Sequence, residues 1–291
     1  MQQAIEKARV LIEALPYIKA FQGCVVVVKY GGSTLGDDHP DPAILRDIVF
    51  MATVGMRPIL VHGGGKRISK RLKEAGIDSR FVQGLRVTDA SAMRVVEDVL
   101  VNDVNVAIVT MLRGLGCDAV PLSGTTGRMV RVEKMTGTDE QGTPVDWGFV
   151  GRVARVNPRP IFNELMARRV PVVAPIGVDD QDNSYNVNAD AVASEIASSL
   201  TAEKLVYLTD VPGLLRNKDD EDSLISTIRV EDVPGLTAEG VISGGMLPKV
   251  EACLNALRNH VHKTHIISAR IPHSLLLEIY TDKGIGTEIV P

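Results

Sequence analysis

The sequence is poor in several residues on which particular classes of protein depend. Aromatic residues make up 4% of its 291 positions, with a single Trp, which argues against a surface that stacks nucleic-acid bases. Lys and Arg together number 32 against 36 for Asp and Glu, so the formal net charge is −4. A chain without excess positive charge is a poor general binder of nucleic acid or of an anionic membrane. Any phosphate chemistry must therefore come from local groups.

Cysteine is also scarce, since only Cys24, Cys117 and Cys253 occur and they lie far apart. With no C-x-x-C pair, they are expected to be reduced, buried thiols in a cytosol-like compartment. The apolar run Val25–Val28 is far too short to span a bilayer, and charged residues interrupt the first twenty positions, unlike the core of a signal peptide. We therefore expect a soluble, cytoplasmic protein that binds neither nucleic acid nor membrane.

The common nucleotide and hydrolase motifs are missing as well. Gly65-Lys66 is followed by Arg67 and lacks the upstream glycine of a P-loop, and Ile68 stands where G-x-G-x-x-G requires its last glycine. There is no G-x-S-x-G nucleophile turn and no H-E-x-x-H zinc motif. These absences argue against the classes of α/β enzyme that the missing motifs define.

What the sequence does contain is a repeated order of buried strand, glycine-rich turn and helix. This order is typical of an α/β fold with a mainly parallel sheet. The elements expected are a strand over Cys24–Val28, the turn Lys29-Tyr30-Gly31-Gly32-Ser33, a helix over Ala43–Val54, a strand over Pro58–Val61, the turn His62-Gly63-Gly64-Gly65 and a helix over Lys66–Ala75.

The rest of the chain continues the pattern. An amphipathic helix precedes the first strand, and Pro16 is expected to kink or divide it. The segment Arg128–Arg155 predicts hairpins over the rim of the sheet. Further helices are expected over Ala90–Leu115, Ile161–Arg168, Asn188–Leu200, Pro248–Asn259 and Ser274–Tyr280, and strands over Ala119–Leu122, Val170–Ile176, Lys204–Leu208 and Thr264–Ile267.

Both glycine-rich turns follow strands, and ligands of an open parallel sheet bind at the carboxyl ends of its strands. Glycines let backbone N–H groups approach an anion closely, and a following helix adds its positive end. Many single glycine turns are only tight turns. Two on consecutive units, with Lys29 nearby, predict a phosphate-handling site.

Two polar motifs extend this site. Asn186-Val187-Asn188-Ala189-Asp190 places amides and a carboxylate at a helix start, and N-capping explains one of these residues but not three. In Ser243-Gly244-Gly245-Met246-Leu247-Pro248-Lys249, the lysine falls in the first turn of a helix, where the dipole favours anions. A bound phosphate would supply the opposite charge.

Two further groups have open interpretations. Arg86 and Thr88 are expected on a loop, where the arginine either binds a carboxylate or is a solvated surface residue. The imidazoles of His260, His262 and His265 either bind a metal or belong to a solvated loop that leads into a strand.

Together the motifs resemble the amino acid kinase family and, within it, the acetylglutamate kinases. They cover nearly the whole chain in family order, and the Arg86 and Asn186–Asp190 motifs favour the acetylglutamate member over carbamate kinase, aspartokinase, glutamate 5-kinase and UMP kinase. The resemblance implies a three-layer αβα sandwich with a mainly parallel open sheet. The motifs are Lys29-Tyr30-Gly31-Gly32, His62-Gly63-Gly64-Gly65, Gly84-Leu85-Arg86-Val87-Thr88, Asn186–Asp190, Leu208-Thr209-Asp210-Val211-Pro212-Gly213 and Gly244-Gly245-Met246-Leu247-Pro248-Lys249.

The resemblance implies ATP-dependent phosphorylation of the γ-carboxylate of N-acetyl-L-glutamate, a step of arginine biosynthesis. Lys29 and Lys249 would neutralise the transferring phosphoryl group and the leaving ADP. Asp190 would hold the two lysines in position. The backbone N–H groups of Gly32 and Gly64 would act like an oxyanion hole on the same group.

Substrate and nucleotide contacts follow from the same resemblance. Arg86 with Asn186 would grip the α-carboxylate of the substrate, with Gly64, Gly65 and Asn188 as further substrate contacts. Mg²⁺ would arrive with ATP, held mainly by phosphates and water, so no metal site of the chain's own is expected. The nucleotide-binding residues expected are Lys29, Gly31, Gly32, Thr209, Asp210, Val211, Gly213, Leu214, Gly245, Met246 and Lys249.

The two ends of the chain resemble the arginine-inhibited hexameric branch of these kinases, through Leu15-Pro16-Tyr17-Ile18, Leu277-Glu278-Ile279-Tyr280 and Gly284-Ile285-Gly286-Thr287. This implies that Tyr17, Glu278 and Gly284 bind inhibitory arginine and that the N-terminal helix interlaces dimers into a hexameric ring. A nitrogen-signalling protein is a candidate partner. The implied division is an interface helix over 1–22, an acetylglutamate-binding lobe over 23–200 and an ATP-binding lobe over 201–291.

The chain also departs from the family pattern near the expected substrate rim. Gly124-Thr125-Thr126-Gly127 replaces Gly-Lys-Asp-Gly, and Lys66 stands where proline is common. One alternative is therefore a kinase for a longer or carrier-linked acyl amino acid, such as an aminoadipate derivative. In that case the basic residues Lys66, Arg67, Lys70 and Arg71 would meet an acidic carrier, although they also fit a solvated helix face. A second alternative is a non-catalytic arginine sensor.

Overall fold

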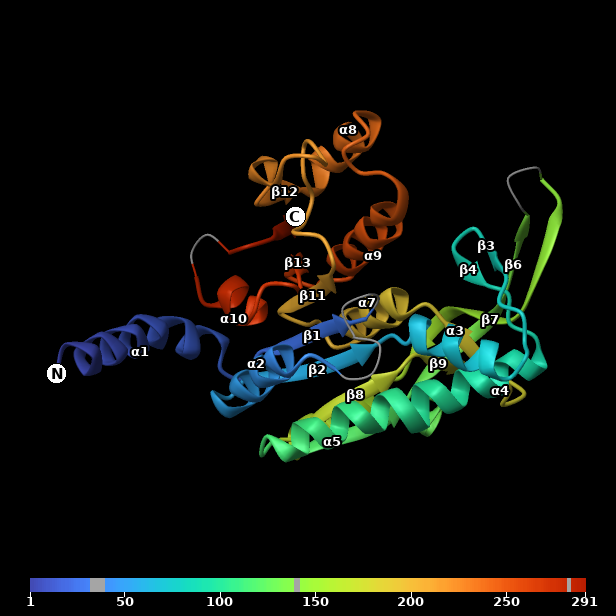
Figure 1. Cartoon of the computed structure of the whole chain (residues 1–291), viewed down its shortest axis with the longest axis horizontal. Coiled ribbons are helices and arrows are strands. Elements are labelled where there is room, and N and C mark those ends of the chain that lie inside the picture. The colour runs from blue at the N-terminus through green and yellow to red at the C-terminus, as the bar shows by residue number, and fades with distance from the viewer. Residues whose placement is uncertain (32–39, 139–141, 282–283) are drawn as a thin grey trace.

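The computed structural model describes residues 1–31, 40–138, 142–281 and 284–291 (Figure 1). Its central eight-stranded sheet has the strand order β12-β14-β13-β11-β1-β2-β8-β5. Neighbouring strands run parallel except for the pair β13 and β14, so the predicted mainly parallel sheet is confirmed. The strands are β1 (Val25–Tyr30), β2 (Arg57–His62), β5 (Ala119–Ser123), β8 (Val170–Ala174), β11 (Lys204–Thr209), β12 (Thr227–Arg229), β13 (Lys263–Ser268) and β14 (Thr287–Val290).

Helices cover both faces of this sheet, and alternate residues of a strand point to opposite faces. Val26 and Val28 of β1 pack into one apolar core, while Val27 packs into the other. The predicted three-layer arrangement is therefore confirmed. The first core includes α2 (Pro42–Thr53), α3 (Gly65–Glu74), α4 (Ala90–Asp98), α5 (Val106–Gly114) and α10 (Ser274–Ile279), and the second includes α6 (Arg159–Met166), α7 (Ala189–Ser199), α8 (Val233–Ala238) and α9 (Leu247–Arg258).

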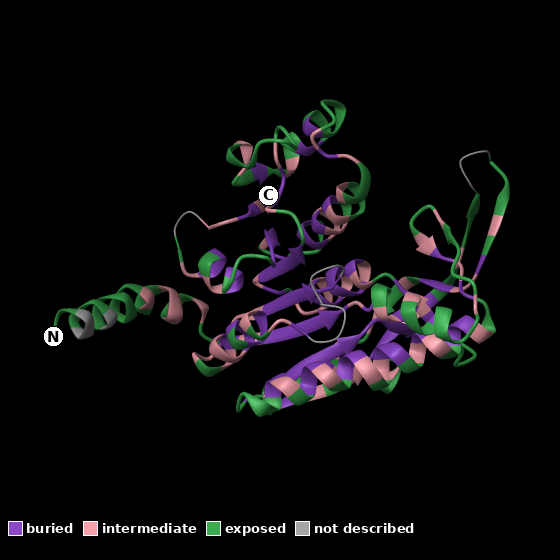
Figure 2. Cartoon of the chain, viewed as in Figure 1, coloured by how far each residue is buried: buried purple, intermediate pink, exposed green. Residues whose placement is uncertain are grey.

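The inner strands are buried along nearly their whole length, as Figure 2 shows in purple. Their sequences, such as Val-Val-Val-Val-Lys-Tyr for β1, are rich in β-branched residues that suit a strand covered on both faces. Lys29 is thus carried at the end of a rigid, fully packed strand.

The rim of the sheet carries a closed barrel of four strands rather than simple hairpins. Its order is β10-β7-β6-β9, and β6 pairs antiparallel with β7 as the predicted hairpin. The expected strand Val170–Ile176 is in fact split at Pro175, because β9 leaves the main sheet to pair with β10. The elements are β6 (Val130–Thr138), β7 (Pro144–Val156), β9 (Ile176–Val178) and β10 (Ser184–Val187), beside the small hairpin β3 (Phe81–Val82) and β4 (Leu85–Arg86).

The helix expected over 90–115 contains a seven-residue π-helical segment, η2 (Val99–Asn105), between α4 and α5. Short 3₁₀ turns complete the described elements: η3 (Thr126–Arg128), η4 (Glu221–Ser223), η5 (Val230–Asp232) and η6 (Gly244–Met246).

The N-terminal helix α1 (Gln2–Phe21) extends away from the body of the chain (Figure 1). One helix runs through Pro16, so the predicted division is wrong, while the alternative, a kink at Pro16, stays a prediction. Proline removes one backbone hydrogen bond there, but an exposed helix can present the freed carbonyl to water. Its apolar side chains Ile5, Val10, Leu11, Ile12 and Leu15 are exposed.

The expected boundary between the two lobes falls between α7 and β11, while the sheet runs on across it through the pairing of β1 with β11. The division into lobes stays a prediction. In the described part of the chain, no helix is long and apolar enough to cross a membrane.

Candidate functional site

A cavity of about 380 Å³ opens where β2 ends and α3 and α7 begin. It lies at the carboxyl ends of parallel strands, where the pattern of glycine turns predicted it. Of the residues predicted to bind substrate or to act in catalysis, its lining includes Lys29, Gly64, Gly65, Arg86, Asn186, Asn188 and Asp190.

Asp190 joins the two predicted catalytic lysines. Its Oδ1 lies 2.8 Å from Nζ of Lys29, and its Oδ2 accepts a 2.7 Å hydrogen bond from Nζ of Lys249. Burial on its own would raise the pKa of Asp190, but the charges of Lys29 and Lys249 outweigh burial, so the pKa lies below its ordinary value. The carboxylate is therefore ionised, and the trio of Lys29, Asp190 and Lys249 carries one net positive charge.

Local sequence explains where these groups stand. Asn188 caps α7, because its Oδ1 accepts a 2.7 Å hydrogen bond from the backbone N–H of Asp190. Lys249 lies in the first turn of α9, against the helix dipole. The sequence suggested a bound phosphate as its opposite charge, whereas in the structure Asp190 supplies one.

The two glycine turns approach each other so closely that side chains would not fit. The backbone N–H of Gly63 donates a 2.8 Å hydrogen bond to the carbonyl of Tyr30 at the end of β1. A Cβ on Gly31 would lie 3.0 Å from the Gly63 nitrogen, and one on Gly64 would lie 2.7 Å from Cδ2 of Leu100. Gly32, predicted to bind the phosphoryl group and the nucleotide, lies outside the described residues.

Arg86 is buried in the cavity wall, so the interpretation as a solvated surface residue is wrong. It belongs to the short strand β4 rather than to a loop. Its Nη2 donates to the Gly65 carbonyl at 3.1 Å and to Oγ of Ser69 at 2.8 Å, and Nη1 contacts Ser79. The guanidinium lies over the Phe81 ring, 4.6 Å from its centroid. Burial lowers the pKa of Arg86, but a guanidinium stays charged in proteins.

Asn186 is joined to the same wall through Thr88. Its Nδ2 donates to Oγ1 of Thr88 at 3.3 Å, and that hydroxyl donates to the Arg86 carbonyl at 2.8 Å. Thr88 is itself held by backbone hydrogen bonds with Trp147 and Phe149 of β7. The barrel therefore fixes the amide and guanidinium that face the cavity.

Apart from Lys29, Gly31 and Gly32 around the end of β1, the residues predicted to bind the nucleotide lie at the end of β11, in the segment that follows it, and around the start of α9. Thr209 ends β11, where its Oγ1 donates to the Val211 carbonyl at 2.8 Å, and Asp210 is exposed beside it. Gly245 and Met246 form η6 just before Lys249. Gly213 has a φ of 155°, and a Cβ there would lie 2.6 Å from Oγ1 of Thr287. Leu214 is 1% exposed in the apolar core, so it shapes this region through packing.

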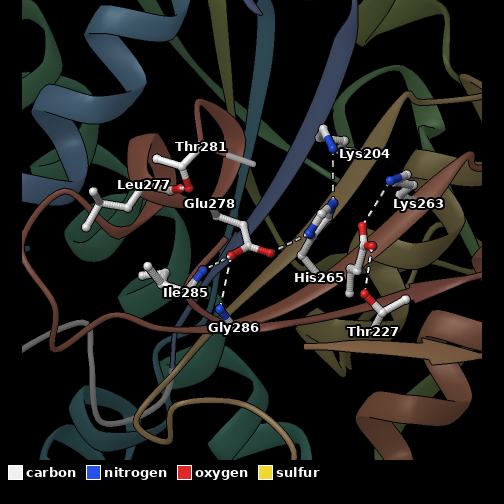
Figure 3. Close-up of polar contacts among 10 residues, drawn as sticks. Lys204, Thr227, Lys263, His265, Leu277, Glu278, Thr281, Ile285 and Gly286 are labelled. Carbon is white, nitrogen blue, oxygen red and sulfur yellow. Dashed lines mark hydrogen bonds and ion pairs between the residues drawn. The ribbon is translucent and has the colours of Figure 1, made fainter. Parts of the chain in front are cut away.

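The three residues predicted to bind arginine share a second cavity, of about 280 Å³, beside α1 and α10. Tyr17, Glu278 and Gly284 all line it. Glu278 accepts hydrogen bonds from the backbone N–H groups of Ile285 at 2.7 Å and Gly286 at 3.0 Å (Figure 3). A Cβ on Gly284 would lie 2.7 Å from Oε2 of Glu278.

Sequence reasoning missed the other charged residues of this cavity. His265 lies 2.7 Å from Oε1 of Glu278 through Nδ1 and 3.2 Å from Nζ of Lys204 through Nε2 (Figure 3). Glu288 receives a 3.0 Å hydrogen bond from Nζ of Lys263. The cluster of three histidines was the signal available in the sequence for this cavity. Its members do not share one site, because His262 pairs with Glu203. Among the described residues, no group of three His, Cys, Asp or Glu could hold a metal ion.

The departures from the family pattern lie away from the cavity. The lining residues include neither Lys66 nor any residue of Gly124–Gly127, all of which the structure describes. Two of the basic residues of α3 pair within the chain: Arg67 lies 2.7 Å from Oδ1 of Asp103, and Arg71 lies within 4.0 Å of three carboxylates.

The parallel sheet, the glycine turns and the trio of two lysines and a carboxylate define an α/β phosphate-handling protein. Residues 25–268 match the sequence model of the amino acid kinase family, and the chain belongs to that family. It is 50% identical to the acetylglutamate kinase of Heliobacterium modesticaldum, with 100% of both chains covered. It is 48% identical to the acetylglutamate kinase of Desulforamulus reducens, covering 100% of this chain and 99% of that one.

Solved structures agree on the fold. The N-acetylglutamate synthase of Neisseria gonorrhoeae, in complex with coenzyme A and N-acetyl-glutamate, superposes with a TM-score of 0.80 at 24% identity. The match covers 97% of this chain and 62% of the synthase, so the present chain corresponds to only part of that longer protein.

Proposed function

We propose that this chain is an ATP-dependent kinase that phosphorylates the γ-carboxylate of N-acetyl-L-glutamate in arginine biosynthesis, in the cytoplasm. Full-length identity of 50% to an acetylglutamate kinase supports the substrate. The observation that carries the proposal is the trio of Lys29, Asp190 and Lys249 at the edge of a cavity that also holds Arg86 and Asn186.

The trio suits phosphoryl transfer, which needs alignment and cancellation of charge more than covalent work by the protein. The γ-carboxylate of the substrate attacks the terminal phosphorus of ATP as the bond to ADP breaks. Lys29 and Lys249 neutralise the charge on the transferring group and the leaving ADP, and Asp190 holds both ammonium groups at fixed positions. The Gly64 N–H adds a preorganised donor to the same group.

Substrate selection depends on the opposite wall of the cavity. The buried guanidinium of Arg86 offers N–H groups for the α-carboxylate, and Asn186 offers an amide beside it. Gly65 and Asn188 complete the contacts at the starts of α3 and α7.

ATP brings Mg²⁺ with it in this proposal. Both oxygens of Asp190 are paired with lysines, and the described residues contain no group of three His, Cys, Asp or Glu side chains that could hold a metal ion. These residues fit a cation that is held by phosphate oxygens and water and that adds charge neutralisation during transfer.

An ATP-dependent hydroxamate assay tests the proposal, with N-acetyl-L-glutamate beside a panel of longer acyl amino acids. Acetylglutamate is expected to give the highest kcat/KM. Turnover of a longer acid, such as an aminoadipate derivative, together with negligible turnover of acetylglutamate would overturn the substrate assignment. Absence of turnover with every acid would favour the non-catalytic sensor.

We also propose that the second cavity binds arginine and that α1 joins dimers into a hexamer. The cavity combines the carboxylates of Glu278 and Glu288 with the ammonium groups of Lys204 and Lys263, which suits a ligand with both a guanidinium and a carboxylate. The exposed apolar side chains of α1 suit an interface between subunits. A nitrogen-signalling protein remains a candidate partner of that assembly.

A further inference from the structure

The π-helical segment η2 packs directly on the glycine turn that follows β2. Leu100 leaves no room for a side chain on Gly64, and Val104 lies 3.6 Å from the same Cβ position. Asp103 pairs with Arg67 just beyond the turn. π-Helical turns are rare and are frequently found at functional sites. Leu100, Asp103 and Val104 therefore form the face of this segment that packs on the glycine turn and the start of α3.

Asn105, the last residue of η2, points its amide nitrogen into the core. The side chain is 1% exposed, and Nδ2 lies 2.9 Å from the Val172 carbonyl and 3.1 Å from the Leu122 carbonyl. Two carbonyl oxygens require a donor, so they fix which end of the amide faces them. The same Nδ2 lies 3.1 Å from Nε2 of His62. The amide has two N–H groups for these three acceptors, so one N–H is shared, and a protonated Nε2 would place a second donor against the amide. We therefore assign Nε2 as the unprotonated acceptor.

His62 must then carry its proton on Nδ1. Nδ1 lies 3.0 Å from the Gly63 carbonyl, to which an N–H there can donate. The ring is fully buried, and this burial lowers the pKa of His62 to about 4, so the imidazole is neutral at working pH. One tautomer thus satisfies both nitrogens.

This hydrogen bond fixes the direction of a functional N–H group. In a planar trans peptide, the carbonyl oxygen and the following N–H point in opposite directions, and the described residues contain no cis peptide bond. When His62 holds the Gly63 carbonyl, the Gly64 N–H is directed away from the imidazole. The Gly63 N–H is held in turn by the Tyr30 carbonyl. Gly63 and Gly64 both line the cavity.

We propose that His62 is a positioning residue, held in its Nδ1–H tautomer by Asn105, that aims the Gly64 N–H at the transferring phosphoryl group. The inference rests on the proposed kinase reaction and deepens it. His62 and Asn105 act through the peptide between Gly63 and Gly64 and touch no reacting atom.

The first test determines the tautomer of His62 without measuring any reaction. In protein labelled with ¹⁵N-histidine, His62 is expected to show a protonated Nδ1 and an unprotonated Nε2. A protonated Nε2 would overturn the proposal. This result is independent of the substrate, so it stands apart from any failure of the acetylglutamate assay.

The second test compares His62→Asn with His62→Gln. An Asn amide can replace the Nδ1–H donor to the Gly63 carbonyl, whereas a Gln amide reaches the position of Nε2. His62→Gln is expected to lower kcat by about tenfold or more, since loss of a preorganised donor acts in the transition state, with KM for both substrates within about twofold. His62→Asn is expected to stay within about threefold of the parent kcat.

Equal losses of kcat in the two variants, or a change in KM alone, would overturn the proposal. Thermal melting identifies any variant that is merely unfolded. If His62→Gln does not fold, Asn105→Ala replaces it, with the ¹⁵N tautomer of His62 as the readout. Retention of a fixed Nδ1–H tautomer in folded Asn105→Ala would contradict the role given to Asn105.

Discussion

Lys249 donates a 2.7 Å hydrogen bond to Asp190, although 59 residues separate them along the chain. The contact joins the first turn of α9 to the first turn of α7. Because Lys29 occupies the other carboxylate oxygen, one buried acid sets the spacing of two cations.

Asp190→Asn should impair both catalysis and stability. Lys29 is nearly buried, and leaving a buried charge without its partner costs about 3 kcal/mol. We expect turnover to fall by roughly a hundredfold because the two ammonium groups repel each other and lose their positions. Turnover assays and urea unfolding measure the two effects. Asp98→Asn, at an exposed carboxylate on α4, is the matched control. Turnover of Asp190→Asn within twofold of the parent would contradict the role.

Lys249→Ala should lower kcat strongly while the fold remains intact. The side chain is partly exposed, so its removal leaves no large buried void. We expect a decrease of about 10²-fold or more in kcat, as for loss of a transition-state electrostatic contact. Steady-state kinetics and circular dichroism provide the measurements, with the exposed Lys73→Ala as the control. An unchanged kcat would remove Lys249 from the mechanism.

Arg86→Lys should raise KM for acetylglutamate by about tenfold or more and change kcat much less. A lysine keeps the positive charge but loses the planar fork of donors that Arg86 directs to Gly65, Ser69 and the cavity. Arg71→Lys, at a half-exposed position of the neighbouring α3, tests for a nonspecific effect. A KM within twofold of the parent in Arg86→Lys would show that the fork does not bind the substrate.

Stability should fall with acidity because His62 is neutral in the folded protein. Its pKa is lowered by burial from 6.5 to about 4. Between these values the unfolded chain binds a proton that the native chain does not, so the unfolding free energy decreases as pH falls from 6.5 towards 4. The loss is roughly 3 kcal/mol. Urea unfolding at pH 4.5 and 7 should show a smaller difference in His62→Asn than in the parent or in the exposed control His260→Gln. Equal differences in all three would contradict the assignment.

Deletion of residues 1–20 should separate assembly from catalysis. The deletion removes the exposed apolar face of α1 and also Tyr17 of the second cavity. We expect a smaller assembly by light scattering, weaker inhibition by arginine and retained turnover. Leu11→Asp with Leu15→Asp keeps Tyr17 and tests the interface alone. A retained hexamer with unchanged inhibition in the deleted chain would contradict both roles.

Local pattern predicted much of the fold, because the inner strands of the main sheet are mostly β-branched or apolar runs, and β1 and β2 are each followed by a glycine turn. The edge strands β12 and β14 were not predicted. The closed barrel could not be predicted, since β10 pairs with β7 and β6 pairs with β9 through contacts distant in sequence. The π-helical segment also escaped prediction, because the apolar spacing of residues 90–115 fits an ordinary helix. In the structure, the π-helical segment packs against Gly64 and the apolar core.

In the candidate site too, some features could be predicted from the local sequence and others could not. Lys29 and Asp190 follow local signals, a strand end and a helix start, and the family resemblance gave their roles. The burial of Arg86 depends on Ser69 and Ser79, which its own motif does not contain. The pairing of His62 with Asn105 spans 43 residues. No local signal distinguished Asn105 from the neighbouring Asn102 and Asp103 of the same segment.

The continuous sheet also limits how the two expected lobes can move. β1 and β11 are paired in register from Val26 with Lys204 to Tyr30 with Leu208, and both strands are buried on both faces. Separating β1 from β11 would break the hydrogen bonds between the two strands and expose both apolar cores. Any closure of the predicted lobes over ATP would therefore have to twist the intact sheet and tilt the helices packed on it. In such a motion Lys29 would move with the sheet, whereas Lys249 would move with α9, so the distance between the two ammonium groups would report on the closure.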